Sequence, residues 1–433
     1  MAGPGRVVVV GGGVIGVCVA YELARRGADV VLLERDRLGA GASSGNAGTV
    51  SAGHPPLNRP GRVRRALMQM ADPTSPLYIK PRWDPALWRW LADFARHCTD
   101  AHVASCMEVM APLGKEALRL FAEIVGEERI TCGYRQDGYF DACRTERGWS
   151  EARHEASMIA AHGYHPEVLD GRALRELEPV LAPDIVGGIF YPEAGTLNPH
   201  QFVLGVAGAA RARGATIREG EGVVDVTMEG GAARGVRLAS GEMLGCDAVV
   251  LATGPFSLAL ARRLGTRLPV QPGKGYHRDL SVGHGGAPKL RVAGVLNETS
   301  VFCTPMDGFV RFAGTMEFSG LNHVMRRPRL EQLTRAAADY LPGLEVRVPL
   351  SEWCGLRPVA SDGLPIVGPL PGVPSVVAAT GHGMLGLTLG PVTGALVADW
   401  VLEGTTRPLW RRLAPQRTST TRRRGFRNSI TRT

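Results

Sequence analysis

Residues 6–34 of this chain read RVVVVGGGVIGVCVAYELARRGADVVLLE. An apolar run, residues 7–10, leads into a glycine-rich turn, and a second apolar run, residues 30–33, ends at Glu34. Buried parallel strands are near-continuous apolar runs, and a helical stretch lies between these two. The sequence here therefore predicts two parallel strands joined by a helix, the βαβ unit of a doubly wound α/β fold.

Three glycines in the turn have the spacing of a phosphate-binding fingerprint. Gly11 permits the tight turn off the first strand, Gly13 lets backbone N–H groups approach a pyrophosphate, and Gly16 lets the helix pack against the sheet. Glu34 ends the second strand, where a carboxylate accepts hydrogen bonds from ribose hydroxyls and repels a 2′-phosphate. The unit therefore predicts a dinucleotide site that disfavours NADP.

A second glycine-rich signature lies near the C-terminus. It comprises Gly355-Leu356-Arg357-Pro358, then Asp362-Gly363, then TGHGMLG at residues 380–386. The last stretch precedes an apolar helix, so a helix N-terminus can point at the pyrimidine edge of a flavin and stabilise its reduced, anionic form. Together the two signatures predict a flavin site that is closed by both ends of the chain.

Composition limits the remaining possibilities. The chain has 433 residues, 44% of them hydrophobic, and a net charge of +9. Residues 404–433 contain nine arginines and no acid, so the rest of the chain is neutral overall. We expect a basic, disordered tail there, with weak attraction to anionic lipid or nucleic acid as the alternative to a solvated extension. Neutrality elsewhere argues against a folded nucleic-acid-binding groove.

The cysteines and the apolar runs predict a compartment. Eight cysteines are scattered without a CxxC pair, and no secretory leader precedes the first strand. No apolar run approaches the roughly 18 residues of a membrane span. We expect a cytoplasmic protein whose membrane contact is at most peripheral, on the inner face of the cell membrane.

Further motifs carry a family resemblance that covers nearly everything before residue 404. They are Ser43-Ser44-Gly45-Asn46-Ala47-Gly48, Ser51-Ala52-Gly53-His54, PVQPGKGY at 269–276, FAGTME at 312–317 and the two C-terminal blocks. In this order they resemble the FAD-dependent D-amino acid dehydrogenases of the D-amino acid oxidase superfamily. The resemblance implies noncovalent FAD, no metal, and deamination of a D-amino acid by hydride transfer to flavin N5. The products would be a 2-oxo acid and ammonia, with electrons passed to a quinone or an electron-transfer partner.

The resemblance also implies an architecture. We expect a Rossmann-like FAD-binding domain interleaved with a substrate domain that is built on a mainly antiparallel sheet. The expected boundaries are 1–60, 150–265 and 346–403 for the FAD-binding domain, 61–149 and 266–345 for the substrate domain, and 404–433 for the tail. Three tryptophans, Trp83, Trp88 and Trp90, crowd a helix that begins after Asp84, and we expect them to pack rather than to touch a ligand.

Site residues follow from the same motifs. Arg357 is the predicted clamp for the substrate carboxylate, because a guanidinium fork donates two parallel hydrogen bonds; its alternative is a structural ion pair. The other predicted catalytic residues are Tyr276, His382 and His54, with strand packing or a backbone contact as the alternative. The predicted cofactor-binding residues are Gly11, Gly13, Val14, Ile15, Gly16, Glu34, Arg35, Ser43, Ser44, Asn46, Ala47, Gly48, Val224, Thr253, Gly254, Lys274, Gly381, Gly383, Met384, Leu385 and Gly386.

Several alternatives stay open at this point. A glycine- or sarcosine-type oxidase would keep the same motifs and produce hydrogen peroxide. A cyclic secondary amine such as hydroxy-D-proline is a possible substrate, since residues 304–317 are similar to dehydrogenases of that class. Cys354 precedes Gly355 near a position where sarcosine oxidases bind flavin covalently, although a buried structural cysteine is the first interpretation. A nicotinamide-linked dehydrogenase would need a second glycine unit, which the sequence lacks, and a tRNA-modifying flavoprotein would use the tail.

Overall fold

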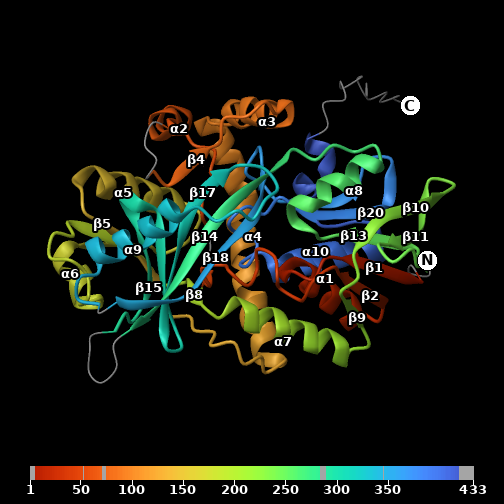
Figure 1. Cartoon of the computed structure of the whole chain (residues 1–433), viewed down its shortest axis with the longest axis horizontal. Helices are drawn as coiled ribbons and strands as arrows, with labels where there is room; N and C mark the ends of the chain where they lie inside the picture. The colour runs from red at the N-terminus through yellow and green to blue at the C-terminus, as the bar shows by residue number, and fades with distance from the viewer. Residues whose placement is uncertain (1–4, 52, 71–74, 283–288, 345, 419–433) are drawn as a thin grey trace, which may run out of the picture.

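Two large sheets lie side by side in this computed structural model, and the long helix α4 (Asp100–Glu127) runs between them (Figure 1). The structure describes residues 5–51, 53–70, 75–282, 289–344 and 346–418. It has the α/β architecture that the sequence predicts, with one mainly parallel and one mainly antiparallel sheet.

The first sheet has six strands in the order β19-β20-β13-β1-β2-β9. All neighbours are parallel except β19 and β20, which are antiparallel. The strands are β1 (Arg6–Val10), β2 (Asp29–Glu34), β9 (Thr216–Glu219), β13 (Ala248–Leu251), β19 (Ile366–Leu370) and β20 (Val373–Thr380). The central pair β13-β1 therefore joins strands that are more than two hundred residues apart, and β20 adds the C-terminal signature beside them.

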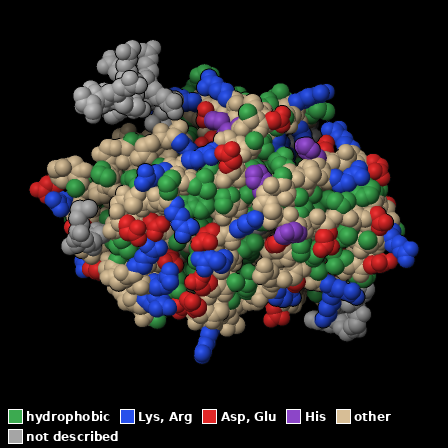
Figure 2. Space-filling view, turned by 180° about the vertical axis from the view of Figure 1, so that it is seen from behind, with side chains coloured by type: hydrophobic (Ala, Val, Ile, Leu, Met, Phe, Trp, Pro, Cys, Tyr) green, Lys and Arg blue, Asp and Glu red, His purple; other side chains and the backbone are tan. Residues whose placement is uncertain are grey.

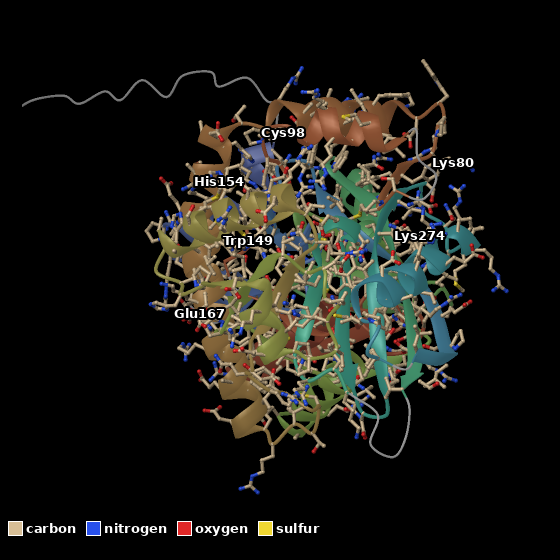
Figure 3. The ribbon with its side chains drawn as sticks, turned by 90° about the vertical axis from the view of Figure 1, so that its left-hand side faces the viewer. Lys80, Cys98, Trp149, His154, Glu167 and Lys274 are labelled. Carbon is tan, nitrogen blue, oxygen red and sulfur yellow. The ribbon has the colours of Figure 1, made fainter. Side chains whose placement is uncertain are left out.

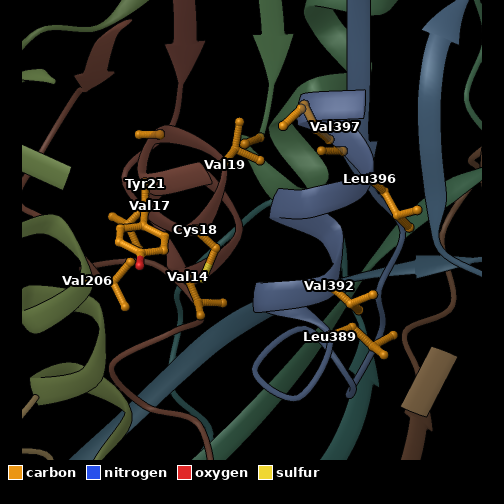
Figure 4. Close-up of a cluster of buried hydrophobic side chains, with 14 of the residues drawn as sticks. Val14, Val17, Cys18, Val19, Tyr21, Val206, Leu389, Val392, Leu396 and Val397 are labelled. Carbon is orange, nitrogen blue, oxygen red and sulfur yellow. The ribbon is translucent and has the colours of Figure 1, made fainter. Parts of the chain in front are cut away.

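Both faces of this sheet are covered, which explains its continuous apolar strands. Val7 and Val9 face helices, and Val8 and Val10 face a small antiparallel sheet. The helices are α1 (Val14–Arg25), α7 (Pro199–Ala212) and α10 (Gly390–Glu403), whose apolar side chains meet in one cluster (Figure 4). The small sheet consists of β10 (Val223–Glu229), β11 (Ala232–Leu238) and β12 (Met243–Gly245).

The second sheet has nine strands, eight of them in the order β18-β14-β17-β16-β15-β5-β7-β6, with β4 paired to β17. Only β15 with β5 and β17 with β4 are parallel. Its strands are β4 (Leu77–Ile79), β5 (Tyr139–Cys143), β6 (Glu167–Asp170), β7 (Gly187–Tyr191), β14 (Val270–Val282), β15 (Ala293–Leu296), β16 (Val301–Met306), β17 (Phe309–Phe318) and β18 (Val346–Ala360). One face packs on α6 (Gly171–Leu177) and α9 (Arg327–Tyr340).

The remaining helices connect or cover these layers. They are α2 (Arg62–Met70), α3 (Pro85–Arg96), α5 (Glu146–Ala160), α8 (Ser257–Arg263) and the 3-10 turns η1 (Gly254–Phe256), η2 (Asn297–Thr299), η3 (Trp410–Leu413) and η4 (Pro415–Thr418). A short pair, β3 (Thr49–Val50) and β8 (Gly195–Thr196), links the loop after β2 to the strand region before α7. No helix in the described ranges is long and apolar enough to cross a bilayer.

Three of the expected domain segments contain elements of both layers. Strands β6 and β7, inside 150–265, and β18, inside 346–403, belong to the nine-stranded sheet because they pair with its strands. Helix α4, inside 61–149, contributes to the core of the six-stranded sheet, where Phe121 stacks on Phe202 at 4.5 Å. The chain therefore crosses between the two layers more often than the sequence predicts.

The expected packing of the three tryptophans holds for one of them. Trp90 is 5% exposed and donates a hydrogen bond to the Val359 carbonyl (3.0 Å), whereas Trp83 is 90% and Trp88 is 54% exposed. Helix α3 buries Leu87 and Trp90 on one face, and Trp88, one position on from Leu87, points elsewhere.

The expected disordered tail is also wrong for residues 405–418, and residues 419–433 lie outside the described residues. Trp410 and Leu413 are buried in the core of the six-stranded sheet. Arg417 pairs with Asp362 (2.8 Å) and donates to the Leu364 carbonyl. The basic composition predicts a solvated segment, but its apolar residues Trp410 and Leu413 pack on the fold. On the face that Figure 2 shows, basic and acidic side chains are interspersed, unlike the one-signed surfaces that bind nucleic acid.

This packing yields a stability prediction. Leu413→Ala should lower the free energy of unfolding by roughly 2–5 kcal/mol, because it leaves a cavity at a fully buried site. Arg407→Ala, an exposed position in the same segment, should leave it unchanged. Denaturant unfolding followed by fluorescence measures both. Equal stability of the two variants would show that the segment is not part of the fold.

Candidate active site

A cavity of about 1430 Å³ is lined by residues from both sheets. Small-molecule pockets usually measure about 300–1,000 Å³, so this one has room for a dinucleotide and a second ligand. Its walls include the glycine turn after β1, the end of β2, the loop at 40–47, strand β18 and the turn at 379–388. Both ends of the chain therefore contribute to the same site, as the sequence predicts.

The glycine turn is built around close backbone contacts. Gly11 has φ +107°, and a Cβ at Gly16 would lie 1.8 Å from the Gly11 carbonyl oxygen. The Val14 amide at the start of α1 donates to the Ser43 hydroxyl (2.9 Å). Only glycine allows α1 to begin this close to β1. The first turn of α1 consequently borders the cavity.

Glu34 lies at the end of β2, beside this turn. Its carboxylate accepts hydrogen bonds from the Gly12 amide (2.6 Å) and the Asp36 amide (2.9 Å), so the side chain is held toward the cavity that it lines. A fixed carboxylate beside a helix N-terminus fits the ribose and pyrophosphate of a dinucleotide.

The loop at 42–48 is held by residues that the sequence did not single out. Arg311 donates to the carbonyls of Ser44 and Asn46 (3.0 Å each) and forms a two-pronged ion pair with Asp279. Trp353 lies against Gly45, where an added Cβ would come within 2.2 Å of the indole. These partners come from β14, β17 and β18, so only strand register could have identified them.

Arg357 lies on β18 with its guanidinium above Gly275 of β14, where a Cβ would be 2.2 Å from the guanidinium carbon. One nitrogen donates to the Thr315 carbonyl (2.8 Å), and no carboxylate of the described residues pairs with it. Burial lowers the pKa of Arg357 to about 10, so the group stays charged near neutrality. An unneutralised cation that lines a cavity is a site for an anionic ligand group.

Tyr276 and Lys274 do not line this cavity, which corrects both predictions. The Tyr276 hydroxyl donates to Glu317 (2.7 Å), and Lys274 pairs with Glu317 at 3.1 Å. Neighbouring residues of a strand point to opposite faces, and Gly275 takes the cavity face under Arg357. Figure 3 shows Lys274 among the strands of the nine-stranded sheet.

Cys354 also lies outside the cavity lining, as a free, buried cysteine packed in the core beneath the nine-stranded sheet. Its thiol donates to the His323 carbonyl (3.2 Å). This environment fits the structural cysteine that the sequence suggested first.

His382 lines the cavity, but its ring is held as a structural group. Nε2 lies 2.9 Å from the Thr393 hydroxyl on α10, and burial lowers the pKa of the imidazole to about 3. The ring is therefore neutral near pH 7. The Gly383 amide donates to the Pro358 carbonyl (2.8 Å), which ties the turn to β18.

His54 lines the far part of the cavity. The Tyr139 hydroxyl is 2.8 Å from Nε2, and Nδ1 is 3.9 Å from the carboxylate of Glu155, which also pairs with Arg59. Burial would raise the pKa of Glu155, but its interactions with Arg59 and His54 outweigh this effect and lower the pKa to about 2.

Most of the predicted cofactor residues border the cavity. Those that do are Gly11, Gly13, Val14, Ile15, Glu34, Arg35, Ser43, Asn46, Ala47, Val224, Thr253, Gly254, Gly381, Gly383, Met384, Leu385 and Gly386. Gly16, Ser44 and Gly48 lie behind this wall and shape it through backbone contacts. Roles for these residues remain predictions.

Comparison with known proteins identifies relatives of this chain. The family model described as FAD dependent oxidoreductase (DAO) matches residues 6–400. D-amino acid dehydrogenase of Methylobacterium nodulans is 36% identical over 406 residues, which are 92% of this chain and 95% of the relative. D-amino acid dehydrogenase of Sinorhizobium medicae is 33% identical over 92% of this chain and 96% of its own length.

Solved structures show the same fold. Glycine oxidase from Geobacillus kaustophilus has a TM-score of 0.75 at 24% identity, with 95% of this chain and 98% of that chain covered. L-proline dehydrogenase from P. horikoshii has a TM-score of 0.74 at 18% identity, with 96% and 98% covered.

The glycine turn provides a prediction about cofactor binding. Gly16→Ala should give protein with little or no bound flavin, because the new Cβ would collide with the Gly11 carbonyl and displace α1 from the strand. Gly41→Ala borders the same cavity but has no atom within 4 Å of its Cβ, and it should bind flavin normally. The visible absorbance per protein after gel filtration measures this. Full flavin content in Gly16→Ala would contradict the placement.

Proposed function

The chain belongs to the DAO family of FAD-dependent oxidoreductases, and from that membership we propose that it oxidises the Cα–N bond of D-amino acids. The product imine would hydrolyse to a 2-oxo acid and ammonia. The observation that carries this proposal is Arg357, a buried guanidinium with no carboxylate partner among the described residues. Its charge matches the carboxylate that every amino acid presents.

The residues present fit FAD. A helix N-terminus and Glu34 suit the adenosine and pyrophosphate, and the small residues Gly45, Asn46 and Ala47 line the cavity, where a flat ring would lie along the main chain. The turn at 381–386 would hold the remaining edge. When bound, FAD supplies the two-electron oxidant for the substrate.

We assign Arg357 the role of orienting the substrate. The Thr315 carbonyl and the space above Gly275 fix the guanidinium in one position, so a bound carboxylate has its Cα held in one place. A fixed position matters because the Cα–H bond must point at the oxidant for hydride transfer. Tyr276 has no part in this arrangement, since its hydroxyl lies on the other face.

Substrate must also lose a proton, since an ammonium group cannot donate electrons from nitrogen. We propose His54 Nδ1 as the acceptor for substrate that enters through this part of the cavity. In the tautomer in which Nε2–H donates to the Tyr139 oxygen, Nδ1 carries the lone pair that accepts the proton, and the carboxylate of Glu155, 3.9 Å away, would stabilise the imidazolium that forms. His382 is already neutral and bound to Thr393, so we propose only a backbone role for its turn.

Substitution of the clamp tests this function. Arg357→Ala should keep flavin but weaken capture of D-amino acids by roughly 2–5 kcal/mol in kcat/KM, the usual cost of removing one partner of a desolvated charge pair. Arg357→Lys should recover only part of this, because an ammonium lacks the two-pronged fork. Tyr276→Phe is the matched control and should stay near wild type.

Steady-state assays with a dye acceptor, alongside a hydrogen peroxide assay, measure these variants. Wild-type rates in Arg357→Ala would remove Arg357 from the site. If hydrogen peroxide forms in an amount equal to the substrate consumed, the protein is a glycine- or sarcosine-type oxidase and not a dehydrogenase. This oxidase is the second candidate function. Greater activity with hydroxy-D-proline than with primary amines would identify a cyclic secondary amine as the substrate.

We also propose that the electrons pass to a lipid-soluble quinone at the membrane. Eight of the fourteen large hydrophobic side chains exposed in the described ranges lie in two segments of the chain, and we infer that they form one patch. They are Val63, Leu67, Met68, Trp83, Trp88, Leu321, Val324 and Met325, called here the apolar rim. Lys80 and Arg82 join the two segments through the Phe318 carbonyl.

Charge on the apolar rim favours an anionic lipid surface. Within residues 62–68, 75–96 and 319–327 every exposed charged side chain is basic: Arg64, Lys80, Arg89, Arg96, Arg326 and Arg327. Lys80 lies at the edge of the molecule in Figure 3. Exposed tryptophans beside basic residues are typical of proteins that bind the membrane interface. Val63, Leu67 and Trp88 also border the cavity, so a quinone could enter from the bilayer.

Vesicle flotation tests the apolar rim. Trp83→Ser combined with Trp88→Ser should bind anionic vesicles at least roughly tenfold more weakly than wild type, because two interfacial anchors are lost. Met243→Ser removes a 53% exposed side chain on β12 and should bind normally. Dye reduction should be unchanged in both. Undiminished flotation of the double variant would contradict membrane contact at this surface.

A further inference from the structure

One row of side chains crosses the nine-stranded sheet on the face toward the cavity. Strand register aligns Asp141 with Val295, Val295 with Phe302, Phe302 with Ala313, Ala313 with His277 and His277 with Trp353. Asp141, Val295, Phe302, Ala313 and Trp353 all line the cavity. The floor is therefore apolar in the middle, with an indole at one end and a carboxylate at the other.

Asp141 has no basic partner among the described residues. Its two carboxylate oxygens accept hydrogen bonds from Asn297 Nδ2, at 3.0 and 2.9 Å. Burial, with smaller contributions from Glu155 and Glu298, raises the pKa of Asp141 to about 7 against the opposing hydrogen bond from Asn297 and the positive charge of Arg59. Burying a carboxylate in the cavity wall without a counter-ion is unfavourable in free energy. Asp141 also has no role in the oxidation proposed above.

The neighbours of Asp141 complete a small recess. Tyr139 and Tyr191 stack at 4.8 Å on β5 and β7, two residues along the strand from Asp141. Both rings border the cavity. Two nearby arginines are already paired, Arg59 with Glu155 and Arg65 with Glu151, and Arg62 also lines this end of the cavity. Aromatic faces beside a carboxylate favour a cationic or N–H-bearing group.

The distance between Arg357 and Asp141 is suited to a substrate with a long side chain. The guanidinium of Arg357 bonds to β17 at Thr315, and β17 is separated from β5 by β16 and β15. Three strand spacings are about 14 Å, and Thr315 lies two residues along β17 from Ala313, the residue in register with Asp141, so the direct separation is about 16 Å. A substrate carboxylate at Arg357 and a hydrogen bond of about 3 Å at each end leave a gap that an extended lysine or arginine side chain fills. The chain would lie along Phe302 and Val295.

We propose that Asp141, with Asn297, Tyr139 and Tyr191, is a specificity subsite that binds the distal cationic group of a long basic D-amino acid such as D-lysine or D-arginine. The subsite rests on the proposed function, because the substrate must be anchored by its carboxylate at Arg357. It deepens that function by naming the substrate class. A methyl side chain ends over Phe302 and gains nothing from Asp141.

Equilibrium binding separates this subsite from turnover. 6-Aminohexanoate carries a carboxylate and a distal ammonium but no α-amine, and hexanoate is its apolar match. Calorimetry on the oxidised holoenzyme should show 6-aminohexanoate binding roughly 10- to 100-fold more tightly than hexanoate, and Asp141→Asn should abolish this preference. Glu151→Gln removes the same charge from the cavity wall and should preserve it.

Steady-state kinetics provide a second test of the subsite. In Asp141→Asn, kcat/KM for D-lysine and D-arginine should fall roughly 10- to 100-fold, mostly through KM, while D-norleucine and D-alanine change less than about twofold. An equal loss for all four substrates would show that Asp141 is only structural and would overturn the subsite.

Two further outcomes also count against the subsite. A preference for D-glutamate that Arg62→Gln removes would mean that the side-chain end of the cavity binds anions. Intact 6-aminohexanoate preference in Asp141→Asn would place the cation elsewhere. If no D-amino acid reduces the flavin but the 6-aminohexanoate preference behaves as stated, the proposed function fails and the subsite stands.

Discussion

Everything at this site depends on the pairing of β13 with β1 and β20 in one parallel sheet. That pairing places the glycine turn at the N-terminal end of the chain beside the turn at 381–386 near the other end. Both turns then open on the same edge, where helix N-termini and strand ends meet in a doubly wound fold. The apolar runs of β1 and β13 are buried on both faces, so the hydrophobic effect that stabilises the sheet also assembles the cofactor site.

The nine-stranded sheet provides the opposite wall of the cavity. Its side chains alternate between two faces, so structural residues lie on one face and cavity-lining residues on the other. On one face Tyr276, Lys274 and Glu317 form a buried polar cluster. On the other face Arg357 and Asp141 border the cavity. Strand β18, for example, contributes the cavity-lining residue Trp353 and the buried core residue Cys354 at adjacent positions.

Local motifs predicted the fold class and the dinucleotide turn, because Gly11, Gly16 and Glu34 act through contacts within one βαβ unit. Long-range register was beyond sequence reasoning. Lys274 was assigned to the wrong face since a motif does not say which way a strand is turned. Arg311 and Asp141 were missed because their partners are distant in sequence. The prediction that residues 405–418 are disordered was wrong. It relied on their arginine content and gave too little weight to Trp410 and Leu413, which pack on the core.

The central claim is that this cavity holds FAD and presents to it an amino acid of D configuration. Anaerobic mixing of the purified holoenzyme with matched D- and L-alanine and with D- and L-lysine, followed by the flavin's visible absorbance, tests it most directly. The account predicts that the D enantiomers bleach the flavin and the L enantiomers leave it oxidised. Bleaching by the L enantiomers alone, or by none of the four, would contradict it.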